Sequence, residues 1–204
     1  MFTGIIQNTA PVAWVKASSD FTRYALRFTE DLLKDLVLGA SVSIHGVCQT
    51  VISIENDVVV FEAIKETLNK TTLQSLAQNQ ILNIERSLKM GDEIGGHLLS
   101  GHVYGTALIS KIDSPTNQQK IFTVQCEPSW MKYIFYKGFI ALNGASLTVG
   151  NVVPAGFFTV NLIPETLKRT TFGKVEVGEE INVEIDSQTM MIVDSVERVL
   201  LQPS

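Results

Sequence analysis

Short segments that alternate between apolar and polar residues, or that are rich in β-branched residues, run along the whole chain. The first half contains six of them, at residues 12–16, 24–28, 41–45, 50–54, 58–61 and 81–86. Such segments, separated by turn residues such as Asn56 and Asp57, are typical of strands in a small antiparallel barrel or sandwich. The second half repeats the scheme at residues 106–112, 121–126, 139–142, 147–152, 157–162 and 181–185. We therefore predict an all-β fold whose strands form two similar sets.

Two motifs occur twice, at a period of about 98 residues. The sequence GVCQTV at 46–51 returns as GASLTV at 144–149, and ETLNKTT at 66–72 returns as ETLKRTT at 165–171. This period is far longer than that of solenoid repeats, so it indicates two copies of one domain-sized unit. Two similar domains can present two similar but unequal surfaces to one ligand.

The seam between the copies falls near Gly95-Gly96-His97, because the sequence at 99–103 aligns with that at 2–6. We predict an N-terminal domain over 1–97, a C-terminal domain over 98–186 and a terminal helix with its tail over 187–204. No long flexible linker separates the two domains, so we expect them to pack closely.

Helices are a minor part of the pattern. Two short ones are expected at 29–36, where Thr29 is a candidate cap, and at 128–134. A longer helix is expected at the C-terminus behind Asp186-Ser187, with apolar residues at helical spacing. Since that helix lies outside both repeats, it either packs against another chain or docks onto its own barrel.

Composition narrows the class of protein. The 204 residues are 45% hydrophobic and 18% charged, as in an ordinary globular chain, and the net charge of −5 argues against nucleic-acid binding. The N-terminal segment carries neither a basic stretch nor a long apolar run, so we expect no membrane span and a cytoplasmic protein. Cys48 and Cys126 do not form a disulfide pattern and are expected to be free thiols.

Histidines and a cysteine stand at positions where the two copies differ. His102 follows small residues, and its counterpart in the first copy is the apolar Ile5; it is either a specialised reacting group or an ordinary turn histidine. His97 is equally open to a structural role. Cys48 corresponds to Ser146, and it either lines a pocket or acts as a nucleophile. No set of ligands with metal-site spacing surrounds these residues, so no metal is expected.

The repeated ETL segments combine a carboxylate, hydroxyls and a cation. Such a cluster suits a ligand with several hydroxyls and a polar heterocycle, since buried polar groups need partners. The alternative is a local capping role for Thr67 or Thr71. Phosphate-binding glycine loops and a serine-hydrolase elbow are missing from the sequence.

Taken together, these motifs resemble the riboflavin synthase family of the two-barrel type, related to the lumazine proteins. The resemblance runs from residue 1 to about residue 200 and rests on MFTGII at 1–6, the repeated motifs above, GGHLLSGH at 95–102, NGASLTV at 143–149 and PETL at 164–167. It implies two similar six-stranded Greek-key β-barrels plus a C-terminal α-helix that assembles a homotrimer. It also implies a transferase that needs no cofactor and dismutates two molecules of 6,7-dimethyl-8-ribityllumazine into riboflavin and 5-amino-6-ribitylamino-uracil.

The resemblance also implies the site, shared between the N-terminal barrel of one subunit and the C-terminal barrel of its neighbour. The first ligand would be surrounded by Ser41, Cys48, Thr50 and His102, with backbone contacts from Gly4, Ile5 and Ile6. Catalytic residues would be His102, Cys48, Ser41, Thr50, Ser146, Thr148 and Asp186. Substrate-binding residues would be Gly4, Ile5, Ile6, Gln49, Glu62, Ala63, Ile64, Lys65, Glu66, Thr67, Gly101, Val103, Lys137, Leu147, Asn161, Leu162, Ile163, Pro164, Glu165 and Thr166. Lumazine synthase is a candidate partner.

The chemistry suggests roles for three of these residues. His102 is expected to transfer a proton, Cys48 or a neighbouring hydroxyl to activate or attack, and Asp186 to orient. His45, Gln49 and Tyr104 depart from the family pattern. The competing function is a non-catalytic carrier of a lumazine or flavin chromophore, as in the lumazine proteins.

Overall fold

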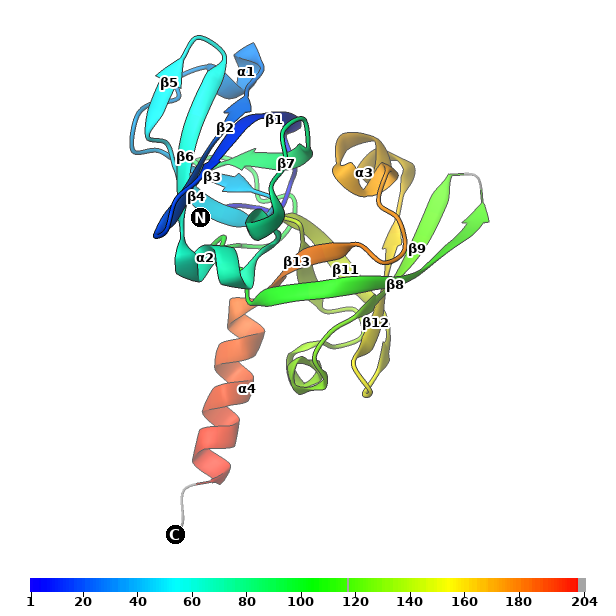
Figure 1. Cartoon of the computed structure of the whole chain (residues 1–204). Coiled ribbons are helices and arrows are strands. Elements are labelled where there is room, and N and C mark those ends of the chain that lie inside the picture. The colour runs from blue at the N-terminus through cyan, green and yellow to red at the C-terminus, as the bar shows by residue number, and fades with distance from the viewer. Residues whose placement is uncertain (117, 202–204) are drawn as a thin grey trace.

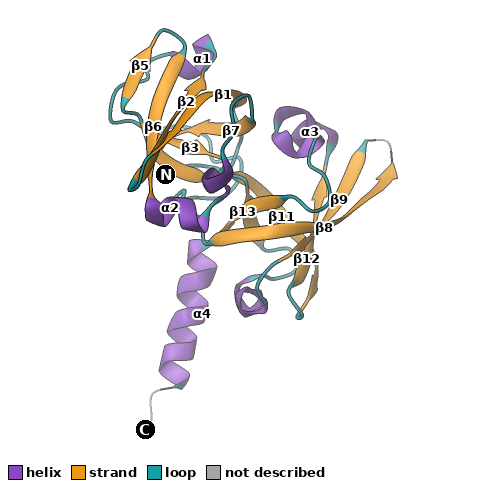
Figure 2. Cartoon of the chain, viewed as in Figure 1, coloured by secondary structure: helices purple, strands orange, loops and turns teal. Residues whose placement is uncertain are grey.

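The computed structural model describes residues 1–116 and 118–201, and it contains two β-units that lie side by side (Figure 1). Strands dominate both units, and the helices are short except for the last, which projects away from them (Figure 2). The predicted all-β duplication with a terminal helix is therefore confirmed.

The C-terminal unit is a closed six-stranded barrel. Its strands follow the order β10-β11-β12-β9-β8-β13, and all neighbours are antiparallel. Along β11 and β12 buried residues alternate with more exposed ones, as expected when one face of a strand lines the barrel interior. The bounds are β8 (Gly105–Thr116), β9 (Gln119–Gln125), β10 (Phe139–Leu142), β11 (Ala145–Val153), β12 (Phe157–Leu162) and β13 (Glu180–Ile185).

The N-terminal unit is a seven-stranded sheet in the order β4-β3-β7-β1-β2-β6-β5. The predicted six-stranded barrel is here a barrel-like sheet of seven strands, because the segment 50–54 is not one strand. It breaks at Val51 and Ile52, whose N–H groups bond to Ala40 on one side and Val60 on the other. The bounds are β1 (Asn8–Ala17), β2 (Phe21–Arg27), β3 (Ser41–Ile44), β4 (Val47–Thr50), β5 (Ser53–Glu55), β6 (Val58–Ile64) and β7 (Ile81–Arg86).

The break matches a feature of the other unit. β4 and β5 together occupy the place that the single strand β11 holds, and β11 has a bulge between Val149 and Val152. A bulge bends a strand, and at the equivalent point the first unit bends enough to interrupt the ladder. Each unit nevertheless encloses its own apolar core, centred on Tyr24 and Phe61 in the first and on Phe122 and Phe158 in the second.

The two units meet through a pair of hairpin turns. His45-Gly46 joins β3 to β4, Asn143-Gly144 joins β10 to β11, and all four residues have the positive φ angles of a type I′ turn. A Cβ atom on Gly46 would lie 2.7 Å from the backbone nitrogen of Gly144, and the reverse distance is 2.8 Å. The turns therefore pack backbone against backbone, which only glycine permits.

Two asparagines fasten this contact. The side-chain amide of Asn83 donates to the carbonyl of Asn143 at 3.0 Å, and that of Asn182 donates to the carbonyl of His45 at 2.8 Å. Their amide oxygens accept from the backbone of Thr171 and Thr72 in the opposite unit, both at 2.8 Å. The two units thus form a pseudo-symmetric pair with satisfied polar groups at its centre.

The short helices only partly match expectation. The predicted helix at 29–36 is a single turn, and Thr29 makes no side-chain capping bond. The segment at 128–134 is a 3₁₀ turn rather than an α-helix. The elements are α1 (Glu30–Leu33), α2 (Lys65–Lys70), α3 (Pro164–Arg169) and the 3₁₀ turns η1 (Thr72–Ser75), η2 (Pro128–Tyr133) and η3 (Thr171–Gly173).

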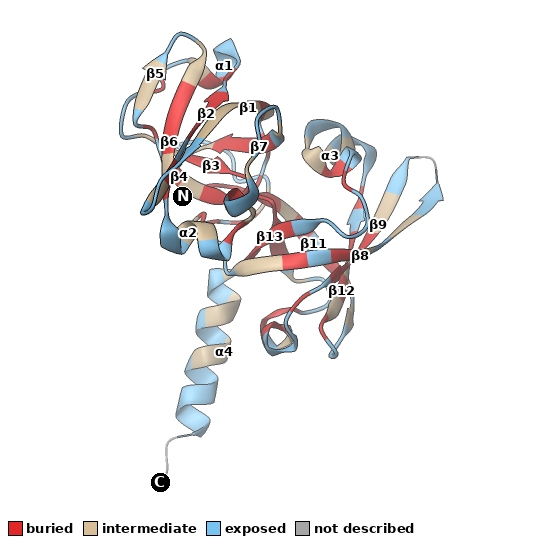
Figure 3. Ribbon diagram, viewed as in Figure 1, coloured by how far each residue is buried: buried red, intermediate tan, exposed pale blue. Residues whose placement is uncertain are grey.

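The terminal helix α4 (Ser187–Leu200) begins where predicted, because the Asp186 carboxylate accepts from the Thr189 N–H at 2.9 Å. One face docks onto the chain's own barrel through Met190 and Val193, and Tyr133 donates to Asp194 at 2.6 Å. The rest of the helix is exposed along its length (Figure 3). The predicted tail at 202–204 lies outside the described residues.

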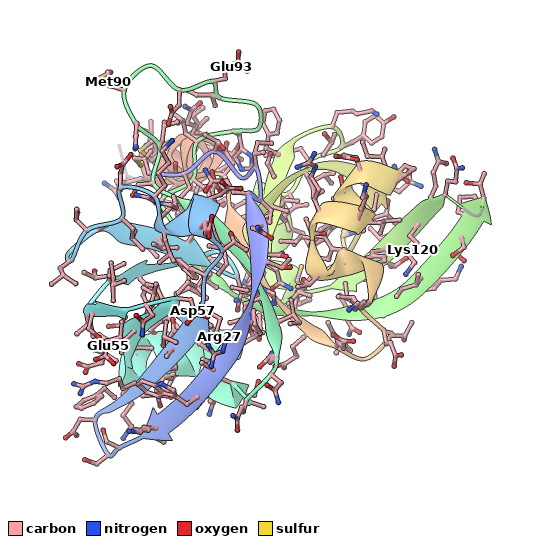
Figure 4. All side chains as sticks on the ribbon, turned by 90° about the horizontal axis from the view of Figure 1, so that it is seen from above. Arg27, Glu55, Asp57, Met90, Glu93 and Lys120 are labelled. Atoms are coloured by element: carbon pink, nitrogen blue, oxygen red, sulfur yellow. The ribbon has the colours of Figure 1, made fainter. Side chains whose placement is uncertain are left out.

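The connection between the units bulges outward, and Met90 and Glu93 mark its outer edge (Figure 4). Below that loop in the same view, Arg27 of β2 pairs with Asp57 beside β6 at 2.9 Å (Figure 4). No helix among the described residues is long and apolar enough to cross a membrane.

Candidate active site

The site is built on equivalent rows of the two sheets. In the first unit Glu85, Ser43 and Cys48 are cross-strand partners on β7, β3 and β4. In the second, Glu184, Ala141 and Ser146 occupy the same places on β13, β10 and β11. Directly paired residues share one face of a sheet, so Cys48 and Ser146, which we call the two predicted reacting positions, each lie in line with a buried carboxylate.

Two extended segments cross over these rows. We name residues 2–5 and 99–102 the first and second leading segments, because each precedes the first strand of its unit. Phe2 and Leu99 bridge the two segments to each other. Gly101 accepts from the Cys48 N–H at 2.8 Å, and Gly4 accepts from the Ser146 N–H at 2.8 Å. Each leading segment therefore covers the reacting position of the other unit.

The first half-site consists of Ser41, Cys48, Thr50 and His102. Ser41 and Thr50 are cross-strand partners, and Cys48 is half-buried. His102 is exposed and follows Gly101, whose φ of +78° and 2.6 Å approach to the Cys48 Cβ require glycine. The structure thus brings the four predicted residues to one edge of the first unit.

The second half-site consists of His97, Phe139, Ser146, Thr148 and Asp186. His97 Nδ1 lies 2.7 Å from Ser146 Oγ, and its ring stacks on Phe139 with centroids 4.9 Å apart. Its Nε2 is buried and has no partner among the described residues. Gly96 allows this approach, because a Cβ there would lie 2.7 Å from the Ser146 Cβ.

Electrostatics favour a neutral His97. Burial lowers the pKa of His97, and the nearby Asp186 carboxylate opposes that shift. A neutral imidazole bonded to a hydroxyl can accept its proton, which is the arrangement that activates a serine or orients a water. The second half-site can therefore perform base chemistry, whereas sequence reasoning left His97 open to a structural role. The feature of the sequence that could have indicated a role for His97 is the pair Gly95-Gly96 directly before it, since small residues allow a close approach of the backbone.

One group of predicted contacts falls in a different place. Gly4 was expected beside the first ligand, but a Cβ on Gly4 would lie 2.5 Å from the Cβ of Ser146. The leading segments are exchanged between the units, so Gly4 belongs to the second half-site. Ile5 next to it is exposed, while Ile6 is buried in the core of the second unit.

Several predicted substrate-binding side chains point into the barrels instead. Gln49 is 5% exposed, accepts from the Tyr24 hydroxyl and donates to the Cys48 carbonyl. Leu147 packs in the core of the second unit, as the alternation along a strand requires when Ser146 and Thr148 face outward. Ala63 and Leu162 are each 1% exposed in the two cores. Their side chains do not reach the surface that carries Cys48 and Ser146.

The repeated ETL segments form α2 and α3. Glu66 pairs with Lys70 at 3.1 Å, and Glu165 pairs with Arg169, so each carboxylate is held within its own helix. The alternative prediction, a local capping role for the threonines, is partly correct, since Thr71 and Thr170 cap the following 3₁₀ turns. The exposed members of this predicted group are Ile64, Lys65, Glu66, Asn161, Ile163, Pro164 and Glu165, while Glu62, Thr67, Val103 and Thr166 are half-buried.

Lys137 has an unusual backbone. Its φ is +66°, and the equivalent residue in the first unit is Gly39, with φ of +81°. A side chain in this left-handed conformation costs energy that glycine avoids. The role of its ammonium group in substrate binding stays a prediction.

Three cavities among the described residues lie away from both half-sites. One of them, of about 830 Å³, is lined by His45, Thr72, Asn143, Thr171 and other residues between η1 and η3. Cys48, His102, His97 and Ser146 line none of the three. Within a single chain, these four candidate residues therefore lie outside the cavities described.

Duplicated barrels with paired, unequal half-sites define a class of two-barrel ligand-binding proteins. The chain matches the lumazine binding domain twice, over residues 3–87 and 100–186. It is 46% identical to the riboflavin synthase of Escherichia coli (strain K12) over 98% of this chain and 93% of that protein. Identity to the Chlamydia pneumoniae riboflavin synthase is 43%, over 98% of this chain and 97% of that protein. The chain belongs to the riboflavin synthase family.

Solved structures agree on the fold. LumP complexed with riboflavin superposes with a TM-score of 0.84 at 25% identity, covering 91% of this chain and 99% of that one. LumP complexed with 6,7-dimethyl-8-(1'-D-ribityl) lumazine gives a TM-score of 0.82 at 24% identity, with the same coverage. These likenesses support the two-unit architecture.

Proposed function

We propose that this chain is an enzyme that acts as riboflavin synthase: it converts two molecules of 6,7-dimethyl-8-ribityllumazine into riboflavin and 5-amino-6-ribitylamino-uracil. The four-carbon unit lost by one molecule is gained by the other, so atoms and electrons balance between two copies of one substrate. The observation that carries the proposal is the pair of half-sites, one with Cys48 and His102 and one with Ser146 and His97.

The chemistry needs two groups of different character. One lumazine loses a proton from its C7 methyl group, and the other accepts a nucleophile at its ring. His97, neutral and bonded to Ser146, and His102, exposed beside Cys48, are the proton-transfer candidates. Holding both rings in contact supplies proximity worth about 7 to 11 kcal/mol, so the side chains add a smaller factor.

The half-sites would be completed by a neighbouring chain. The proposal is a homotrimer in which the first half-site of one chain faces the second half-site of the next, assembled by α4. Helix α4 carries five apolar side chains that are each more than half exposed, at Met191, Ile192, Val196, Val199 and Leu200. Apolar surface of this kind is typical of an interface between chains. Truncation after Asp186 should lower the mass measured by light scattering, and an unchanged trimer would contradict the role of α4.

Cellular context follows from the family resemblance. We propose a cytoplasmic location and lumazine synthase as a candidate partner, because that enzyme's name describes the supply of the substrate. Neither affects the site chemistry.

Incubation of the purified protein with 6,7-dimethyl-8-ribityllumazine alone tests the activity. We expect the lumazine absorbance to be replaced by that of riboflavin, with one riboflavin formed for every two lumazines consumed. Stable binding without turnover would instead identify a carrier. The 46% identity to a riboflavin synthase over nearly the whole chain favours the enzyme.

A further inference from the structure

Glu85 holds the first leading segment. Its carboxylate accepts from the Thr3 N–H at 2.6 Å, from the Thr3 hydroxyl at 2.7 Å and from the Gly4 N–H at 3.0 Å. Glu85 is 2% exposed, and no cation among the described residues pairs with it. Burying a carboxylate is costly unless it is well hydrogen-bonded, so these three donors satisfy it.

Glu184 holds the second leading segment in the same way. Its carboxylate accepts from the Ser100 N–H at 2.7 Å, from the Ser100 hydroxyl at 2.8 Å and from the Gly101 N–H at 3.1 Å. The Ser100 hydroxyl oxygen in turn accepts from the His102 N–H at 3.2 Å. Glu184 is 5% exposed. One carboxylate thus fixes both the residue before His102 and the hydroxyl beneath it.

Each clamped segment ends on a reacting position of the opposite unit. Glu85 belongs to the first unit, but the Gly4 that it holds bonds to Ser146 of the second. Glu184 belongs to the second unit, but the Gly101 that it holds bonds to Cys48 of the first. The two connections are equivalent by pseudo-symmetry and opposite in direction.

We propose that Glu85 and Glu184 are positioning residues for the reaction, each clamping the leading segment of its own unit so that a glycine carbonyl fixes the reacting position of the other unit. Glu184 sets Cys48 and His102 in the first half-site, and Glu85 sets Ser146 in the second. Neither carboxylate touches a reacting atom. The identity of the reaction rests on the proposed function, whereas the clamp itself is independent of it.

Thiol alkylation of the folded full-length protein tests the clamp without substrate. Iodoacetamide modification of Cys48 is followed by mass spectrometry in wild type, Glu184→Gln and the matched control Glu85→Gln, with the buried Cys126 as an internal reference. We expect Glu184→Gln to raise the Cys48 rate by roughly tenfold or more, because hydrogen bonds to a charged group are lost. Glu85→Gln should leave the Cys48 rate unchanged.

Turnover of the lumazine provides the second readout. Both variants should lower kcat by roughly tenfold or more with little change in KM, since misplacement of reacting groups impairs the chemical step. Equal Cys48 rates in wild type and Glu184→Gln would overturn the proposal, as would equal acceleration in both variants or faster alkylation of Cys126. If the wild type does not turn over the lumazine, the proposed function is refuted. The rate of Cys48 alkylation still tests the clamp, because that measurement needs no substrate.

Milder variants keep the test open if a glutamine variant fails to fold. Ser100→Ala removes the hydroxyl that links Glu184 to His102, and Thr3→Val removes its counterpart at Glu85. We expect Ser100→Ala to accelerate Cys48 alkylation and Thr3→Val to leave it unchanged. The reverse order would overturn the assignment.

Discussion

The two half-sites share one frame but carry different reacting groups. Glu85 and Glu184 make matching bonds, and so do Asn83 and Asn182 across the centre of the molecule. On that frame the first half-site presents a half-buried thiol and an exposed histidine. The second presents a hydroxyl bonded to a buried histidine.

The contrast separates what the fold needs from what the reaction needs. The carboxylates Glu85 and Glu184 that hold the backbone are equivalent in the two units, whereas Ser41 and Phe139 at equivalent places in the half-sites differ. Identical substrates that must play unequal parts require unequal surfaces. Under the proposed function, the unequal half-sites would give the protein a means of distinguishing donor from acceptor.

Alanine at either central glycine should have the largest effect, since both half-sites depend on the contact between the turns. Gly144→Ala adds a Cβ 2.8 Å from the Gly46 nitrogen at a φ of +83°. We expect about 3 to 5 kcal/mol of lost stability from the clash and the left-handed backbone together. The urea midpoint measures it.

Gly39→Ala is the matched control. Gly39 has a φ of +81° but no atom within 4 Å of its added Cβ, so only the backbone cost of about 1 kcal/mol applies. If the Gly144 and Gly39 variants unfold at the same urea concentration, the close packing of the turns contributes nothing. Gly46→Ala should resemble Gly144→Ala.

Substitution of the two histidines compares the half-sites directly. His97→Gln and His102→Gln should each lower kcat by roughly 10²-fold, the usual contribution of a positioned acid or base. For His102→Gln we expect turnover to fall more than lumazine binding weakens. Steady-state rates and fluorescence titration measure both quantities. Equal losses in rate and affinity would remove the proton-transfer role of the histidine concerned.

The prediction for His45, in the turn between β3 and β4, concerns the stability of the fold and its dependence on pH, and not the reaction. His45 Nδ1 accepts from the Asn83 N–H at 2.8 Å, while its counterpart Asn143 accepts from Asn182 through an amide oxygen that does not titrate. Burial lowers the pKa of His45 to about 4. The unfolded chain, with a pKa near 6.5, binds the proton first, so stability should fall as the pH drops from about 6.5 toward 4.

His45→Asn isolates this contribution from that of the carboxylates. We expect the difference in unfolding free energy between pH 7 and pH 5 to be about 2 kcal/mol smaller in the variant than in wild type. Urea titrations at the two pH values measure it. Parallel pH dependence of wild type and variant would show that folding does not lower the pKa of His45.

Strand patterns and the internal repeat were sufficient to predict two β-units and the capped terminal helix. The segments 139–142 and 147–152 were predicted as strands at the correct places, because both are rich in apolar or β-branched residues. The break at Val51 and Ile52 could not be predicted, since nothing in their apolar side chains marks an interrupted ladder. The first unit was therefore expected to have six strands rather than seven.

The sequence supplied candidate site residues one by one, but not the contacts that connect them in the structure. Cys48 and Ser146 stood out because they replace each other between repeats. The exchange of the leading segments is a long-range contact, so Gly4 was assigned to the wrong half-site, and Gln49 carried no sign that its amide would bond to Tyr24 inside the sheet. Glu85 and Glu184 were not predicted as site residues, because a glutamate in a strand is normally expected to face solvent and its hydrogen-bond donors cannot be read from the sequence.

The central claim is that one active site combines the first half-site of one chain with the second half-site of another. Co-assembly of a Cys48→Ala/His102→Gln chain with a Ser146→Ala/His97→Gln chain, each inactive alone, tests it most directly. If sites form between neighbours, mixed assemblies should recover up to about one quarter of wild-type riboflavin formation, since that fraction of randomly paired sites has both halves intact. Mixed assemblies that remain as inactive as either chain alone would contradict the account.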